Sequence, residues 1–168
     1  MLKLPLELGK IEASGLIDYL YEIFERDFVH QRAMLSGKVW IDPRSERKND
    51  GKEDSFWHLI TRGKVGDRYP DYRRAERLEW VRQIIDSPTH PCVQIFYHRE
   101  SNQRQDVRMY LWAEKHDFVV IIQRLGKSRA FLVTSFYVDH KGKRDDYRKR
   151  LQHYQSGRDA DLSSNVWF

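Results

Sequence analysis

The chain has 168 residues, of which 40% are hydrophobic and 33% are charged, and its formal net charge is +5. This length fits a single domain, residues 1–168, and the hydrophobic content excludes a disordered chain. The one cysteine, Cys92, excludes an intrachain disulfide and a multi-cysteine zinc site, and no apolar run approaches the roughly 20 residues of a membrane span. We therefore expect a soluble, cytoplasmic protein with no membrane partner.

The first half of the chain predicts helices separated by exposed loops. Ser14 could cap a helix that ends near His30, because apolar residues follow it at three- and four-residue steps: Leu16, Leu20, Ile23, Phe24 and Phe28. Residues 39–41 fit a short strand, the charged segment 42–54 fits a loop, and the apolar segment 55–62 reads as a strand. Asp71 then fits the N-cap of a helix of about fifteen residues. Its expected inner face is Tyr72, Ala75, Leu78, Val81 and Ile85.

The second half predicts a sheet. Four apolar or alternating runs, at 93–97, 107–112, 118–122 and 129–138, are joined by short polar connections. Short links between neighbouring strands are typical of an antiparallel meander. A basic helix at 145–155 follows, and the tail 156–168 ends in Val166-Trp167-Phe168, a candidate docking peptide or a segment packed on the core. The predicted fold class is α+β, with N-terminal helices, a four-stranded or slightly larger antiparallel sheet and a short C-terminal helix.

His58 is the first candidate functional residue. It lies among bulky apolar residues and precedes a loop that carries Arg62 and Lys64. Neighbouring cations lower the pKa of an imidazole and favour its neutral form, which could take a proton from a ribose 2′-hydroxyl. The alternative is an ordinary half-buried histidine.

Two further patterns could contribute to a phosphate site. Arg73, Arg74 and Arg77 lie within one helical turn, where they could clamp phosphate or form a salt-bridged solvent face. On the last predicted strand, side chains alternate between the two faces of the sheet, so Thr134 lies on one face and Ser135 and Tyr137 on the other. Their hydroxyls could donate to a phosphate, although threonine and tyrosine are also common strand residues. Cys92 follows Pro91 and opens an apolar run, which predicts a packed strand residue rather than a nucleophile.

No metal or cofactor motif accompanies these residues. The chain lacks a glycine-rich phosphate loop, a paired-histidine metal signature and a carboxylate cluster with divalent-metal spacing. Cleavage of RNA by 2′-hydroxyl attack needs a base, an acid and cations, but no metal. We therefore expect a site without metal or cofactor.

Three segments together resemble the phage-associated members of the barnase–EndoU–colicin–RelE-like nuclease superfamily. These segments are Phe56 to Arg62, Arg74 to Trp80, and Phe131 to Tyr137. The resemblance covers residues 54–150, leaving an N-terminal helical part at 1–36 and the C-terminal tail. It implies a metal-independent ribonuclease of prophage or toxin type, with helices followed by an antiparallel sheet.

The resemblance also implies roles for individual residues. His58 would be the general base or acid, and Thr134, Ser135 and Tyr137 would contact the scissile phosphate or orient the substrate. Arg62, Arg74 and Arg77, with Lys64 beside them, would bind phosphate. A second catalytic histidine cannot be placed among His98, His116 and His140. The implied partners are RNA and an inhibitor or phage protein. The alternative functions are a nucleic-acid-binding module without catalysis and a protein-interaction module.

Overall fold

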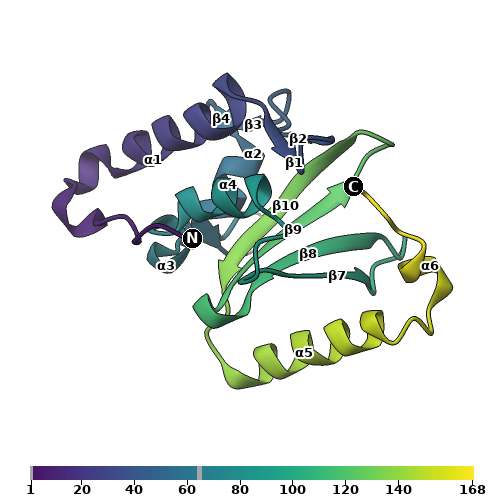
Figure 1. Ribbon diagram of the computed structural model, residues 1–168. Helices are drawn as coiled ribbons and strands as arrows, with labels where there is room; N and C mark the ends of the chain where they lie inside the picture. Colours follow the sequence, from purple (N-terminus) through teal and green to yellow (C-terminus); the bar gives the residue numbers. More distant parts are fainter. Residues whose placement is uncertain (1, 64–65) are drawn as a thin grey trace.

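The computed structural model describes residues 2–63 and 66–168, so Lys64 lies outside the described residues. A central sheet separates two groups of helices (Figure 1). The helices of the N-terminal half cover one face, and the long C-terminal helix α5 lies along the other. The fold is therefore α+β, as the sequence predicts. No helix in the described part of the chain is long and apolar enough to cross a membrane.

The central sheet has six strands and is mixed. In spatial order they are β1 (Ala33–Leu35), β2 (Val39–Asp42), β10 (Arg129–Tyr137), β9 (Phe118–Arg124), β8 (Val107–Ala113) and β7 (Gln94–Arg99). Strands β7 to β10 form the predicted antiparallel meander. The expectation of an antiparallel sheet is wrong for one pair, since β2 runs parallel to β10. The segment 42–54, expected as a loop, contains the small hairpin of β3 (Lys48–Asn49) and β4 (Lys52–Glu53).

The N-terminal helices bury the predicted apolar stripe. After two short 3₁₀ turns, η1 (Leu8–Lys10) and η2 (Ala13–Gly15), helix α1 (Leu16–Phe24) continues as the π-helix η3 (Glu25–His30). Its inner side chains are buried in the main core: Leu20, Ile23, Phe24 and Phe28. Three- and four-residue spacing puts these groups on one side of a helix, so their burial drives this element onto the sheet.

Residues 54–60 form helix α2 (Asp54–Ile60), and the prediction of a strand from 55 to 62 is wrong there. Phe56, Leu59 and Ile60 are fully buried. They stand three and four residues apart, which is helical spacing, whereas a strand would bury every second residue. Only Thr61–Arg62, strand β5, is extended, and it pairs with β6 (Tyr69–Pro70).

The arginine-rich segment forms two short helices instead of one. Asp71 caps α3 (Tyr72–Ala75) by accepting from the Arg74 backbone N–H, as predicted, but α4 (Leu78–Asp86) is a separate helix. The Arg77 side chain bonds the Arg73 carbonyl oxygen, and the Arg77 N–H bonds the carbonyl of Arg74. A continuous helix would join the Arg77 N–H to the Arg73 carbonyl, so this side chain helps to break it. Tyr72 is 61% exposed, which corrects its expected place on the inner face.

The C-terminal segment closes the second face of the sheet. Helix α5 (Lys141–Gln155) begins four residues earlier than predicted, because the His140 ring accepts the Lys143 N–H as an N-cap. Tyr147 of α5 is buried, with Leu151 and Tyr154 packed beside it. After α6 (Ala160–Ser163), Trp167 is only 5% exposed and its ring lies 5.8 Å from that of Tyr97. The tryptophan thus packs on the core, although Val166 beside it is exposed.

Candidate functional site

The imidazole of His58 lies on α2 under the guanidinium of Arg68. Arg68 Nη2 lies 2.9 Å from Nε2 and 3.4 Å from Nδ1 of the ring. Burial of the half-exposed ring lowers the pKa of His58, and the charges of Arg68 and then Arg74 act in the same direction. The charge of Asp54 opposes them. At neutral pH the imidazole is therefore neutral, which is the form that a general base needs.

Gly63 permits the turn that leads from α2 and β5 into the segment carrying Arg68. Its φ is +108°, a conformation that other residues adopt only with strain, and a Cβ added there would collide with the carbonyl oxygen of Asp67. The sequence gives no local signal for Arg68, because this arginine reaches the ring only through the fold of that turn. It is a site residue that sequence reasoning missed.

Arg74 ties α3 to the end of α2. Its Nη1 donates to the carbonyl oxygens of His58 (3.2 Å) and Thr61 (2.8 Å), and its Nε lies 3.2 Å from the Asp71 carboxylate. The same carboxylate accepts from Arg62 Nε at 2.9 Å. Asp71 therefore caps α3 and holds two guanidinium groups beside the backbone of His58. Most of Arg74 is buried, with 16% of its side chain exposed, whereas Arg62 is 39% exposed and can reach a ligand.

Tyr137, near the end of β10, lies between two further arginines. The guanidinium carbons of Arg73 and Arg77 are 5.0 and 4.8 Å from the centre of its ring. Arg77 also forms an ion pair with Glu76 and lies over the ring of Trp80. Only 15% of the Arg77 side chain is exposed. Arg77 is thus engaged with its own neighbours, and its guanidinium is less open to a phosphate than that of Arg62.

The two hydroxyl-bearing residues of β10 have different surroundings. Thr134 Oγ1 donates to the carbonyl oxygen of His58 at 3.3 Å, which brings β10 against α2. Ser135 is 1% exposed, and its Oγ has no hydrogen-bond partner among the described residues. Thr134 therefore belongs to the His58 neighbourhood, and Ser135 does not reach its surface.

Two hollows flank this group. The first has a volume of about 150 Å³ and is lined by His58 together with Arg44, Arg47, Asp54, Ser55 and residues 131–133 of β10. Arg44 lies 4.1 Å from the centre of the Phe131 ring, so this hollow combines cations with an apolar wall. The second hollow has a volume of about 250 Å³ and is lined by these side chains: Arg62, Arg74, Phe136, Tyr137, Val138, Asp139, His140 and Lys143.

The structure thus brings together His58, Arg62, Arg74, Thr134 and Tyr137 from α2, β5, α3 and β10. Sequence reasoning missed Arg44, Arg47 and Lys143, and it left His140 as one of three histidines that it could not place. The first two lie in a segment dismissed as an exposed loop, and the last two lie at the start of a helix whose beginning was placed too late. Within residues 2–63 and 66–168, no three histidine, cysteine or carboxylate side chains are grouped as metal ligands would be.

Comparison with models of known protein families, with curated proteins and with solved structures finds no match to this chain. The superfamily resemblance therefore stays a prediction from short segments. The chemistry of the site has to be argued from its own geometry.

Proposed function

We propose that the protein is a metal-independent endoribonuclease that cleaves RNA by attack of a ribose 2′-hydroxyl. The observation that carries the proposal is the neutral imidazole of His58, which lines one hollow and lies among guanidinium groups, two of which line a second hollow. Such a ring can act as a general base, and fixed cations stabilise the negative charge that develops on the phosphorane. RNA supplies its own nucleophile, so the protein needs only these groups and a proton donor.

In the proposed reaction, the 2′-hydroxyl gives its proton to His58 while its oxygen attacks phosphorus. The bond from phosphorus to the 5′-oxygen breaks, leaving a 2′,3′-cyclic phosphate. Arg62 and Lys143, which line the second hollow, would attract the phosphate there. Tyr137 and His140 of the same hollow carry protons that the leaving 5′-oxygen could take. Arg68 covers the imidazole in the free protein, so substrate binding must draw its guanidinium toward the phosphate.

The test is cleavage of single-stranded and structured RNAs by the purified protein in excess EDTA. We expect products that end in a 2′,3′-cyclic phosphate, and we expect His58→Ala to slow cleavage by about 10²-fold or more. His98→Ala is the matched control, because His98 is also half-buried and lines neither hollow. A wild-type protein that leaves every RNA intact would exclude the ribonuclease.

The second candidate function is nucleic-acid binding without catalysis. The contact of Arg68 with both ring nitrogens of His58 favours it, because a base whose lone pair is covered cannot take a proton. In that case wild-type protein binds RNA with salt-sensitive affinity but does not cleave it. His58→Ala then leaves the affinity unchanged, whereas Arg62→Gln lowers it.

A further inference from the structure

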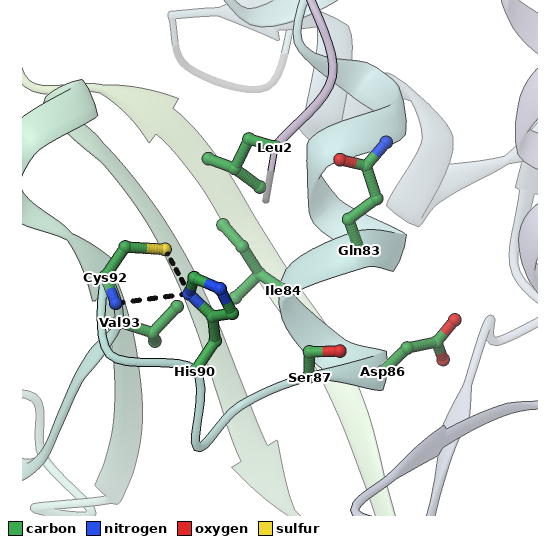
Figure 2. A pocket seen from close by; sticks show the side chains of 8 residues that line it. All are labelled: Leu2, Gln83, Ile84, Asp86, Ser87, His90, Cys92 and Val93. Atoms are coloured by element: carbon green, nitrogen blue, oxygen red, sulfur yellow. Dashed lines mark hydrogen bonds between the residues drawn. The ribbon is translucent and has the colours of Figure 1, made fainter.

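A second cluster lies away from His58, in the turn that joins α4 to β7. Figure 2 shows Cys92 and His90 there, among the residues that line a cavity beside the end of α4. Two backbone hydrogen bonds hold the turn: His90 N–H donates to Ser87 (3.1 Å) and Val93 N–H donates to His90 (2.8 Å). Cys92 packs against the main core, as predicted, but it precedes β7 instead of lying in the strand, and it is only half-buried.

The imidazole of His90 faces the thiol directly. Its Nδ1 lies 2.9 Å from Cys92 Sγ and accepts the backbone N–H of Cys92 at 3.2 Å. An Nδ1 that accepts the N–H carries no hydrogen, which assigns the ring hydrogen to Nε2. The thiol contact with Nδ1 is the shorter of the two, so the lone pair is shared between the N–H and the thiol hydrogen and stays within reach of the thiol. A base is therefore in position to take the thiol proton.

The cavity gives small molecules access to this pair. Its volume is about 250 Å³, and Leu2, Ile84 and Val93 supply apolar wall while Gln83, Asp86 and Ser87 supply polar groups. Both Cys92 and His90 line it and neither is fully buried. A cysteine in an apolar core would be inert, whereas reactive cysteines are partly exposed and have a basic group beside them. None of these lining residues takes part in the two hollows at His58.

We infer that the thiol of Cys92 is a site of oxidation by small peroxides, with His90 as its general base. The Sγ–H bond breaks and its proton moves to Nδ1, while sulfur attacks the nearer peroxide oxygen. The S–O bond forms as the O–O bond breaks, and the departing oxygen takes the proton from Nδ1 and leaves as water or an alcohol. Sulfur loses two electrons and becomes a sulfenic acid, and the peroxide is reduced by the same two electrons. The chain offers no second cysteine to resolve this product as an intrachain disulfide.

The test measures the rate at which hydrogen peroxide oxidises Cys92 in the full chain at pH 7. A dione reagent traps the sulfenic acid, and mass spectrometry of the intact protein and its peptides reports the adduct. His90→Asn is the informative variant, because its side-chain oxygen can still accept the Cys92 N–H but cannot act as the base. We expect the folded wild-type protein to react about 10²-fold faster than His90→Asn.

The same protein unfolded in urea supplies a second comparison that needs no variant. Folded wild-type protein should react faster than the unfolded chain, in which His90 no longer holds Cys92. Equal rates in folded wild-type protein and His90→Asn, or a folded rate no higher than the unfolded rate, would overturn the proposal. If His90→Asn fails a thermal unfolding check, the folded and unfolded wild-type rates alone decide. Neither result depends on whether the protein cleaves RNA.

Discussion

Two half-buried histidines of this protein share a lowered pKa but differ in what surrounds them. At His58 on α2 and at His98 on β7, burial lowers the pKa first and a nearby arginine adds to it. The His98 neighbourhood balances its charges: Arg150 pairs with Asp146 at 2.8 Å, and the Tyr110 hydroxyl donates to Glu100 at 2.6 Å. At His58, Arg68 lies against the ring, and Arg62 and Arg74 lie beside Asp71. Arg62 also pairs with Asp139, and the hollow at the ring is lined by Arg44 and Arg47 as well as Asp54.

This difference separates a structural histidine from a candidate base. A perturbed pKa follows from burial alone, so it cannot by itself mark a functional site. An excess of partly exposed cations beside open hollows is the additional feature at His58. These cations attract an anion toward the ring. The following variants test this comparison, beginning with the largest expected effect.

Arg74→Met should lower the free energy of unfolding by about 3 kcal/mol, because it leaves the buried carboxylate of Asp71 with one cation fewer and removes the Arg74 donor from the carbonyl oxygens of His58 and Thr61. Arg150→Met, in the other neighbourhood, should cost about 1 kcal/mol or less. Its partner Asp146 is 46% exposed, and methionine keeps part of the packing on Tyr147. Urea unfolding monitored by circular dichroism measures both. Equal losses of unfolding free energy would show that the two arginines stabilise the fold to the same extent.

Arg62→Gln should weaken RNA binding several-fold and reduce the salt dependence of the affinity by about one phosphate contact. Arg148→Gln is the control, since Arg148 is also partly exposed (50% of its side chain, against 39% for Arg62) and also pairs with two carboxylates, but on α5. The affinity for a short single-stranded RNA, measured by fluorescence anisotropy over a series of salt concentrations, distinguishes them. The same reduction in both variants would mean that the charge of the whole protein attracts RNA and that the hollows do not.

The pH dependence of stability gives the smallest effect. Both histidines have a lower pKa in the folded protein than in the unfolded chain, so the unfolded chain binds more protons just below the ordinary pKa of about 6.5. The free energy of unfolding must therefore fall as the pH decreases below that value, until the folded-state pKa values are passed. His58→Gln and His98→Gln should each flatten this fall. We expect the larger change for His58→Gln, because two carboxylates oppose the shift at His98 and one opposes it at His58.

Thermal unfolding between pH 5 and 7 measures the slope for wild-type protein and both variants. A slope that neither variant changes would show that other groups cause the acid sensitivity. A larger change in His98→Gln would reverse the proposed difference between the two neighbourhoods.

The sequence predicts the local parts of the fold better than its long-range pairing. Alternation and short connections identify β7 to β10 correctly, and Asp71 is the expected helix cap. The same reasoning fails at Phe56–Ile60, where a run of bulky residues suggests a strand although its apolar spacing is helical. The parallel pairing of β2 with β10 joins segments almost ninety residues apart (Trp40 with Arg129), and no local pattern encodes it.

The candidate site follows the same rule. His58, Arg62 and Arg74 are adjacent in sequence to the loop and helix that position them, so their grouping could be predicted. Arg44 and Arg47 come from a segment far from β10 in sequence. They lie near His58 because they follow β2, which pairs with β10. The hydroxyl of Ser135 suggests a phosphate contact, but the strand directs this side chain into the interior.

The interior position of β10, with β2 on one side and β9 on the other, constrains how the chain can fold. The backbone N–H and C=O groups of β10 are all hydrogen-bonded only after β2, near residue 40, pairs with it. The ribosome makes β10 itself almost ninety residues later. Such distant closure slows folding, since the entropy of a long loop is lost before its contacts form. A fragment that begins at residue 54, although it holds every catalytic candidate, would leave β10 as an open edge ready to pair with another chain.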